Sequence, residues 1–401
     1  MKNKSQIFIW SLFDFGNSSY AVIIVAFVFA VFFKKVIASG ESVGDLYWSL
    51  GINISMAVSA VLNPVCGAIA DYSSSKKKFL LFFTALCIVA TSLMYFTGEG
   101  MIFYALLLFV LSNIGFQTGL TFYDAFISEI TEPENYNKVS GIGYAVGYAG
   151  SLISVALVFP FKDNPGLLFV ISAAFFLIFS LPLFLFLKEK KTVKEKLNTG
   201  YVRYGFNKVG NTLKNINSYS NLKNFLIAYF LYIDAVNTII FFAGIYASTT
   251  LNFETTELAV FFLIVQITAM AGSFLFGYIG NKIGILKSIF INLFIWTLIT
   301  LAVFFTQDKI SFYIIGGFAG TFLGSSQSLS RTMMTFLTPK DFKTEFFGFY
   351  GLFEKTSTIF GPLTFGLVSW LSGSQKLAVL SVGVFFILGM LQLKKVKEKE
   401  Y

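Results

Sequence analysis

Residues 67–78 read GAIADYSSSKKK, so that a long apolar segment ends at Asp71 and a cluster of three lysines follows. Residues 277–287 read GYIGNKIGILK and make a similar transition 210 positions later in the chain. An apolar run that ends in positive charge is typical of a membrane-spanning helix where it leaves the cytoplasmic side of the bilayer. The two stretches therefore predict a membrane protein in which one helical arrangement occurs twice.

The composition of the whole chain agrees with a membrane protein of many helices. Of its 401 residues, 56% belong to the hydrophobic set and only 13% are charged. A soluble globular domain has about 25% charged residues, which cover its surface. We therefore expect an integral membrane protein, because lipid accepts an apolar surface.

Several classes of site are excluded by the residues that the chain lacks. It has no histidine, and therefore no His-centred triad, His metal ligand or His proton relay. Its two cysteines, Cys66 and Cys87, lie in apolar runs as packing residues, and no P-loop motif for ATP occurs. We expect no enzymatic activity, no metal and no cofactor.

The chain contains twelve apolar runs that could cross a bilayer, which takes about 20 residues. These runs are 7–33, 46–70, 79–97, 101–126, 138–159, 166–187, 222–247, 256–280, 286–305, 310–331, 344–370 and 374–393. Between the sixth and seventh runs, residues 188–221 are polar and strongly basic. This stretch is too short to have a core of its own. We expect a linker that could carry an amphipathic helix at the membrane surface.

Lysine and arginine lie mainly in the loops on one side of the membrane. With the N-terminus placed in the cytoplasm, 24 of the 30 basic residues fall on the cytoplasmic side, five on the outer side, and Lys355 inside a span. The outer five are Lys34, Lys35, Lys162, Lys309 and Lys376. Because positive charge marks cytoplasmic loops, we expect both termini in the cytoplasm. This topology explains the basic charge, so we expect no nucleic-acid partner.

The two halves of the chain repeat each other. Asp14 and Asn17 in the first run correspond to Asp234 and Asn237 in the seventh, at an offset of 220 residues. Further matches in the same order are Gly67 with Gly277, Gln117 with Gln327, Pro133 with Pro339 and Gly141 with Gly348. Each half has six runs, so both halves have the same orientation. This predicts a parallel repeat about an axis normal to the membrane.

A twelve-span chain of two parallel six-helix halves resembles the major facilitator superfamily, and residues 67–78 look like its signature loop between spans two and three. Other segments are similar to the vacuole-effluxer-like branch, which groups autophagy-related amino-acid effluxers with bacterial relatives. These segments are FDFGNSSYA at 13–21, FYDA at 122–125, VSGIGYAVGY at 139–148 and FFGFYGL at 346–352. Tyr72, Asn281 and Glu354 depart from the patterns.

The resemblance implies the major facilitator fold, which is all-α and integral to the membrane, with twelve transmembrane helices in two six-helix bundles related by a pseudo-two-fold axis. The N-terminal bundle would span 1–187, the cytoplasmic linker 188–221 and the C-terminal bundle 222–401. It also implies a secondary transporter of amino acids or a similar small polar solute, working by alternating access in a bacterial inner (plasma) membrane. Proton-coupled efflux is one form of such transport. The expected partners are a small-molecule substrate, the coupling proton and the lipid bilayer, and we expect a monomer.

A non-transporting membrane protein, such as a lipid-handling or scaffold protein, is the alternative class. It would need neither acidic residues at matched depths in both halves nor the signature loop in both. A channel is less favoured than either class, because the sequence contains no ring of charges and no filter-like loop.

Asp71 is expected at the cytoplasmic end of the second helix, where the carbonyl dipoles disfavour a carboxylate. It therefore needs a cation or the N-terminus of another helix. The resemblance implies the start of the eleventh span, near Lys343 and Thr344, in a contact that latches the cytoplasmic side closed. The predicted latch residues are Gly67, Asp71, Lys77, Gly277, Asn281 and Lys282. In the alternative, the lysines only set the topology, which leaves Asp71 unexplained.

Six ionisable residues lie within the runs, where each costs about 2.5–3.5 kcal/mol at a helix centre. They are Asp14, Asp124, Asp234, Arg331, Glu354 and Lys355. Asp124 and Arg331 lie near inner helix ends and could simply reach the interface. Glu354 and Lys355 point about 100° apart on a helix, so we expect no good pairing between them.

Each Asp-x-x-Asn pair places a carboxylate beside an amide on one helix face. We expect Asp14 and Asp234 to face the central cavity, where at least one binds a cationic group of the substrate or carries the coupling proton. In the alternative, each pair ties its helix to a neighbour by hydrogen bonds. Tyr144 and Tyr148 form one stripe on their helix. This stripe either lines the substrate path or packs against neighbouring helices. The predicted substrate or coupling residues are Asp14, Asn17, Gln117, Tyr144, Tyr148, Asp234, Asn237, Gln327, Glu354 and Lys355.

Overall fold

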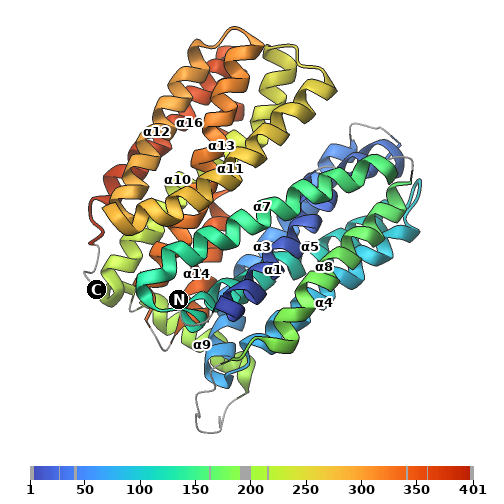
Figure 1. Cartoon of the computed structure of the whole chain (residues 1–401). Helices are drawn as coiled ribbons and strands as arrows, with labels where there is room; N and C mark the ends of the chain where they lie inside the picture. The colour runs from blue at the N-terminus through green and yellow to red at the C-terminus, as the bar shows by residue number, and fades with distance from the viewer. Residues whose placement is uncertain are drawn as a thin grey trace. The chain divides into compact units, whose positions relative to one another are not determined.

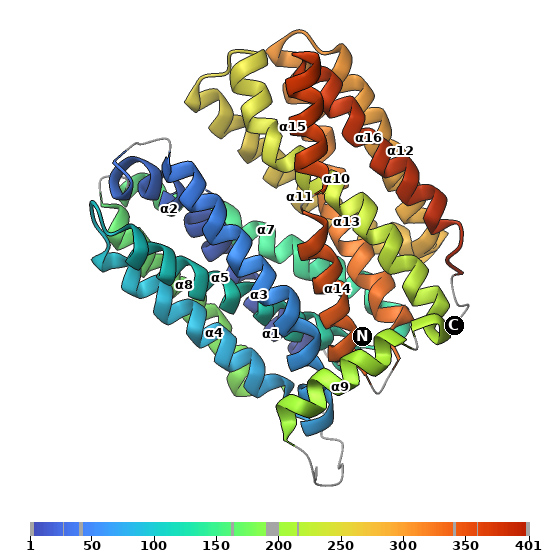
Figure 2. The ribbon, with the colours of Figure 1, turned by 180° about the vertical axis from the view of Figure 1, so that it is seen from behind.

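The computed structural model describes residues 4–26, 28–39, 43–161, 164–189, 200–214, 216–339, 342–358 and 360–397. Throughout these ranges the chain forms helices joined by short turns, and the described part contains no strand (Figure 1, Figure 2). The expectation of an all-α protein is confirmed.

The first half of the chain forms α1 (Lys4–Tyr20), η1 (Ala21–Ala26), α2 (Val28–Phe32), η2 (Phe33–Ile37), α3 (Val43–Ser73), α4 (Lys76–Leu93), η3 (Met94–Phe96), α5 (Ile102–Ala125), α6 (Ile127–Ile130), η4 (Pro133–Asn135), α7 (Tyr136–Phe161) and α8 (Pro165–Phe186). The polar linker contains α9 (Tyr201–Lys214), and η5 (Ile216–Tyr219) follows it. The second half forms α10 (Ser220–Thr250), α11 (Thr255–Ile283), α12 (Ile285–Phe305), α13 (Lys309–Leu337), α14 (Lys343–Ser357), α15 (Phe360–Ser372) and α16 (Gln375–Leu393).

Side-chain caps define where three of the long helices begin. Asn164 accepts a hydrogen bond from the backbone at the start of α8, and Ser374 does the same for α16. Asp308 precedes α13 and accepts from both the backbone N–H and the hydroxyl of Ser311, at 2.8 and 2.7 Å. These two bonds hold the pKa of the Asp308 carboxyl below its ordinary value. Each cap satisfies an N–H that has no partner within its helix.

Ten helical segments of the described chain are long and apolar enough to cross a membrane, and ten of the twelve predicted runs lie on them. The run 310–331 falls on α13, whose glycines and serines reduce its mean hydropathy. The run 344–370 falls on α14 and α15. The multi-span helical fold is thus confirmed, and a count of twelve spans stays a prediction for these two runs.

Helix contacts group the chain into two compact units. Unit 1 comprises Met1–Thr131, Val146–Asn211 and Pro339–Leu352, and unit 2 comprises Glu132–Ala145, Thr212–Thr338 and Phe353–Tyr401. The start of α14 therefore packs among helices of the first half of the sequence, within unit 1. The start of α7 packs among helices of the second half, within unit 2. The predicted division of the chain into two bundles and a linker stays a prediction.

Glycines let the helices of unit 1 approach closely. A Cβ atom on Gly150 of α7 would lie 2.2 Å from the backbone oxygen of Phe15 in α1. A Cβ atom on Gly115 of α5 would lie 2.5 Å from the backbone oxygen of Phe83 in α4. Real side chains do not approach backbone so closely, so only glycine fits at these crossings. Contacts of this kind drive helix association in membranes, where lipid is as apolar as the helix surface.

The outward faces of the helices are apolar. Phe82 of α4 is 62% exposed, Phe103 of α5 is 82% exposed, and Leu185 of α8 is 67% exposed. Soluble monomers rarely expose large apolar side chains on so many neighbouring helices. This surface therefore agrees with a bundle that is surrounded by lipid.

Candidate functional site

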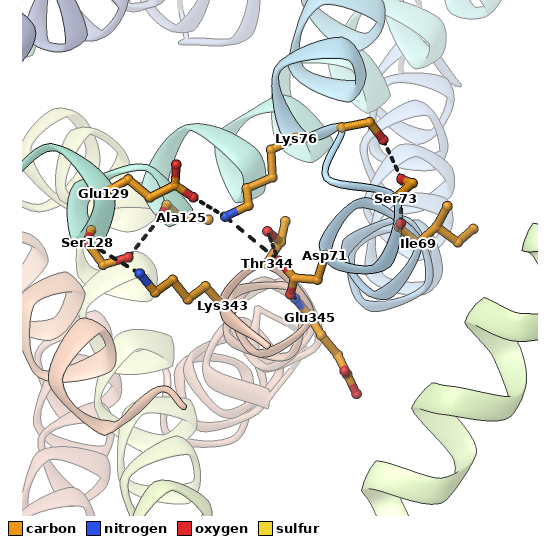
Figure 3. Close-up of polar contacts among 11 residues, drawn as sticks. Ile69, Asp71, Ser73, Lys76, Ala125, Ser128, Glu129, Lys343, Thr344 and Glu345 are labelled. Carbon is orange, nitrogen blue, oxygen red and sulfur yellow. Dashed lines mark hydrogen bonds and ion pairs between the residues drawn. The ribbon is translucent and has the colours of Figure 1, made fainter. Parts of the chain in front are cut away.

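The carboxylate of Asp71 lies against the first turn of α14, within unit 1 (Figure 3). Its Oδ1 accepts from the hydroxyl of Thr344 at 2.7 Å, and its Oδ2 accepts from the backbone N–H of Glu345 at 2.9 Å. Asp71 thus acts as an N-terminal cap for a helix of the other half of the sequence, where the helix dipole favours negative charge. The contact expected between Asp71 and the start of the eleventh span is present.

Two glycines bring α3 and α14 close enough for this contact. A Cβ atom on Gly67 of α3 would lie 2.4 Å from the backbone oxygen of Thr344. A Cβ atom on Gly348 of α14 would lie 2.5 Å from the backbone oxygen of Asn63 in α3. Larger residues at either position would separate the two helices. We call this interface, with the bonds of Asp71, the α3–α14 contact.

Two lysines border the α3–α14 contact (Figure 3). The buried Lys76, the first residue of α4, forms an ion pair with Glu129 of α6, and its Nζ lies 3.8 Å from Oδ1 of Asp71. Nζ of Lys343 donates to the backbone oxygen of Ser128 at 3.3 Å. Lys76 is the member of the lysine cluster that approaches Asp71, whereas the predicted latch residue of this cluster was Lys77.

Lys77 points toward the end of α8. Its Nζ donates to the backbone oxygen of Leu187 at 2.7 Å. Glu189 lies nearby, and burial raises the pKa of its carboxyl. Hydrogen bonds from the backbone N–H groups of Lys76 and Lys77 offset part of this rise. Which of three consecutive lysines turns inward depends on where α4 begins, and their order in the sequence does not show this.

A second interface of the same kind lies within unit 2. The buried Asn137, the second residue of α7, donates through Nδ2 to the backbone oxygens of Phe276 and Gly277 in α11, at 2.7 and 3.0 Å. A Cβ atom on Gly141 would lie 2.6 Å from the backbone oxygen of Ser273. We call this interface the α7–α11 contact. Asn137 was not among the residues predicted from the sequence, although it is the repeat counterpart of Thr344 at an offset of 207 residues.

The three latch residues predicted in the second repeat have different surroundings. Gly277 lies against α7, where its Cβ would be 3.3 Å from Cα of Gly141. Asn281 and Lys282 are exposed. The structure thus brings Gly277 into the α7–α11 contact and leaves Asn281 and Lys282 at the surface.

Arg331 of α13 is fully buried beside α7. Its Nε donates to Oγ of Ser140 at 3.0 Å, and a terminal guanidinium nitrogen donates to the backbone oxygen of Ser140 at 2.8 Å. The guanidinium carbon lies 4.0 Å from the ring centroid of Tyr144, a cation–π geometry. The interpretation that Arg331 reaches the membrane interface is therefore wrong, because only 1% of the residue is exposed. Tyr144 packs against this cation.

Asp14 and Asn17 interact within α1. Nδ2 of Asn17 donates to Oδ1 of Asp14 at 3.3 Å, and both residues are buried. The backbone at Gly147 of α7 comes close to this carboxylate, with a Cβ position 3.4 Å from its Cγ. Tyr148, the next residue, lies within electrostatic range of Asp14. Unit 1 therefore brings together three of the predicted residues, Asp14, Asn17 and Tyr148.

Asp234 is the counterpart of Asp14 and lies in unit 2. It is completely buried, and neither of its carboxylate oxygens has a hydrogen bond of full geometry among the described residues. The backbone N–H of Gly361, in the first turn of α15, interacts with the carboxylate. A Cβ atom on Gly361 would lie 2.7 Å from Oδ1 of Asp234. The N-terminus of α15 therefore provides the partial positive charge beside this buried acid.

Glu354 and Lys355 pair with each other, contrary to expectation. Nζ of Lys355 lies 3.1 Å from Oε2 of Glu354. The prediction from helical geometry was wrong, because it considered the directions of the Cβ atoms and ignored the reach of a four-carbon side chain. Lys355 is buried and Glu354 is half-buried.

The other predicted residues lie on three different helices. Gln117 is buried in α5 of unit 1, and Asp124 is half-buried near the end of the same helix. Gln327 of α13 and Asn237 of α10 are half-buried in unit 2.

An apolar cavity of about 140 Å³ lies within unit 2. Its lining includes Thr238, Gln266, Phe261, Trp296 and Phe312. The hydroxyl of Thr238 also donates to the backbone oxygen of Asp234 at 2.7 Å, so the cavity begins one turn from the buried acid. This cavity was not predicted from the sequence, because its walls come from six helices.

A family model described as "Vacuole effluxer Atg22 like" matches residues 47–400. The chain belongs to this family. It is 32% identical to the uncharacterized MFS-type transporter YxiO of Bacillus subtilis, over 97% of this chain and 94% of the relative. It is 26% identical to autophagy-related protein 22 of Kluyveromyces lactis, over 73% of this chain and 67% of the relative.

Solved structures show the same fold. The human organic anion transporter MFSD10 superposes with a TM-score of 0.77 at 13% identity, covering 97% of this chain and 98% of that one. The proton:xylose symporter XylE superposes with a TM-score of 0.74 at 13% identity, covering 96% and 94%. The fold is therefore that of the major facilitator superfamily. Together with the family match, it identifies a multi-pass membrane transporter and not an enzyme, so the non-transporting alternative is not supported.

Proposed function

We propose that this transporter exports amino acids or closely related small polar solutes by alternating access, with the proton as coupling ion. We further propose that it acts as a monomer in a bacterial inner membrane, with both termini in the cytoplasm. The observation that carries the proposal is the α3–α14 contact. In this contact, a few polar bonds join a helix of the first half of the chain to a helix of the second.

These bonds are of a kind that can form and break in each transport cycle. Asp71 is in the last turn of α3, where its own helix disfavours the charge, and two donors of α14 offset that cost. The α7–α11 contact joins the halves again, through Asn137. We propose that both contacts close the cytoplasmic end of the transport path, and that both open together when solute is exchanged with the cytoplasm.

Asp234 is our candidate for substrate or proton binding. Burial of an ionised carboxylate is costly unless a charge or hydrogen bonds compensate it. The N-terminus of α15 compensates part of this cost, and a proton or a substrate ammonium group would supply the rest. Asp14 already accepts a hydrogen bond from Asn17. Asp234 is therefore the stronger candidate of the two, and Asp14 the repeat-related second.

Transport by proteoliposomes tests this proposal. The purified chain should carry amino acids of a panel and accumulate at least one against its gradient when a pH difference is imposed. Asp234→Asn should abolish pH-driven accumulation and retain exchange of labelled substrate, because a neutral amide cannot release a proton. Asp14→Asn should have the same effect or a weaker one, and Asp308→Asn, at an exposed helix cap, should have none.

Two outcomes would contradict the proposal. If folded protein carries no amino acid of the panel, the proposed substrate class is wrong. If Asp234→Asn and Asp14→Asn both retain full pH-dependent accumulation, neither aspartate couples protons, and unchanged affinity in both would make them structural.

A further inference from the structure

The linker helix α9 contacts both partners of the α3–α14 contact. Gly205 packs on α3, where its Cβ would lie 3.0 Å from side-chain atoms of Val65 and Ile69. The rings of Tyr204 and Tyr72 lie 4.5 Å apart between centroids. All these residues belong to unit 1, and α9 crosses the end of α3 and the start of α14 in Figure 2.

Helix α9 contacts the residue that precedes α14 through a lysine side chain. Nζ of Lys208 lies 3.9 Å from the ring centroid of Phe342, the residue before α14 begins. Tyr72 follows Asp71 directly, and Phe342 precedes Thr344 by two residues. Helix α9 therefore braces the two segments whose polar groups meet at Asp71.

A second face of α9 is apolar and largely exposed. Val202 is 64% exposed and Phe206 is 54% exposed, and Val209 continues the stripe one turn later. Spacings of four and three residues place these side chains on one face, about a quarter turn from Gly205. An apolar stripe on a short polar helix is typical of helices that lie in a membrane interface.

The third face of α9 is polar, and the linker around it is strongly basic. Arg203 and Asn207 are exposed on the side that faces away from α3, and Lys214 is exposed on the same face of the helix. Residues 188–221 contain eight basic residues and two acidic ones. This charge is complementary to the anionic headgroups of a cytoplasmic leaflet. The three faces of α9 therefore suit three different surroundings, namely protein, apolar lipid and charged headgroups.

We propose that α9 lies in the headgroup region of the membrane, with Val202 and Phe206 at the acyl boundary and Arg203 and Lys214 beside anionic phospholipid. Because α9 also braces α3 and α14, binding of anionic lipid stabilises the α3–α14 contact and so shifts the transporter toward the state in which that contact is closed. The lipid interface stands on the geometry of α9 alone. The effect on transport rests on the proposed function.

Tryptophan quenching by brominated lipid tests the interface in the full chain. Phe206→Trp and Asn207→Trp place the probe on the apolar and the polar face of the same helix turn. In vesicles of brominated phosphatidylcholine with phosphatidylglycerol, Trp at position 206 should lose about half of its added emission, and Trp at 207 should lose much less. If both positions are quenched equally, or if position 206 is not quenched, α9 does not lie at the lipid interface. The apolar stripe would then be a binding surface for a protein partner.

Transport in vesicles of graded phosphatidylglycerol content tests the regulation. The parent chain should change its exchange rate by about fivefold between vesicles without and with the anionic lipid. The double variant Arg203→Gln, Lys214→Gln should lose that dependence, and Asn207→Gln with Asn211→Gln should retain it. If the exchange rate of the parent chain does not depend on phosphatidylglycerol content, the proposed regulation is wrong. Absence of transport in every vesicle would refute the proposed function instead, while the quenching result would still decide the lipid interface.

Discussion

The α3–α14 contact of unit 1 and the α7–α11 contact of unit 2 occupy equivalent positions of the repeat. Helices α3 and α11 end 210 residues apart, and helices α14 and α7 begin 207 residues apart. A Cβ on Gly348 would lie 2.5 Å from the backbone oxygen of Asn63, and one on Gly141 would lie 2.6 Å from that of Ser273. The close approach of the backbones is therefore the same in both contacts.

The polar chemistry of the two contacts differs. In the α3–α14 contact, the acceptor Asp71 is on the helix that ends, and the donors are on the helix that begins. In the α7–α11 contact, the donor Asn137 is on the helix that begins, and Asn281, which replaces the aspartate, is exposed. The first contact is thus charge-assisted and the second is neutral, with the buried Arg331 beside it. The repeat has kept its helix geometry and changed the groups that join the helices.

The largest effect is expected from filling the space between α3 and α14. Gly67→Val should force the helices apart, because even a methyl group would lie 2.4 Å from the backbone oxygen of Thr344. Overpacking costs about 1–3 kcal/mol, and a tenfold change takes about 1.4 kcal/mol. The closed population should fall by roughly ten- to a hundredfold, measured from the distance between spin labels at the ends of α3 and α14.

A glycine without close neighbours provides the control for that substitution. Among the described residues, no atom outside the local backbone of α15 lies within 4 Å of the Cβ position at Gly366. Gly366→Val should leave the label distances unchanged. A normal distance in the Gly67→Val protein would show that the helices can adjust, and that glycine is not required at the contact.

An intermediate effect is expected from removing the charge of the α3–α14 contact. Asp71→Asn weakens bonds to a charged group, which are worth about 1.5–3 kcal/mol, so net transport should slow by about tenfold. Asn281→Asp, at the equivalent exposed position, should change transport little. Equal effects of the two substitutions would mean that both repeats use this position in the same way.

The smallest effect is expected at the aromatic partner of Arg331. Tyr144→Leu removes a cation–π interaction of about 1–2 kcal/mol, which should lower the transport rate by a few-fold. Tyr144→Phe keeps the ring face and should restore most of the rate. If the phenylalanine variant is as slow as the leucine variant, the hydroxyl of Tyr144 matters more than its ring, and the α7–α11 contact is more polar than we describe.

Much of the fold could be predicted from the chain itself. Apolar runs of about 20 residues can satisfy their backbone groups in lipid only as helices, so composition and run length determine the secondary structure. The partner of Asp71 could be predicted in part, because a carboxylate at the end of its own helix requires a donor elsewhere. The resemblance of residues 67–78 to a known loop then indicated which helix provides it.

The sequence by itself therefore determined that the chain is a bundle of membrane helices, that its halves repeat, and that Asp71 needs a partner. Only the tertiary structure decided which lysine approaches that carboxylate, that Asn137 and not Asn281 joins α7 to α11, and that Arg331 is buried against Tyr144. The physical reason is that helical periodicity gives the direction of a side chain from its own axis, whereas contacts depend on how neighbouring helices are placed and rotated. Long side chains such as Lys355 also bend away from the direction of their Cβ atoms, as its pairing with Glu354 shows.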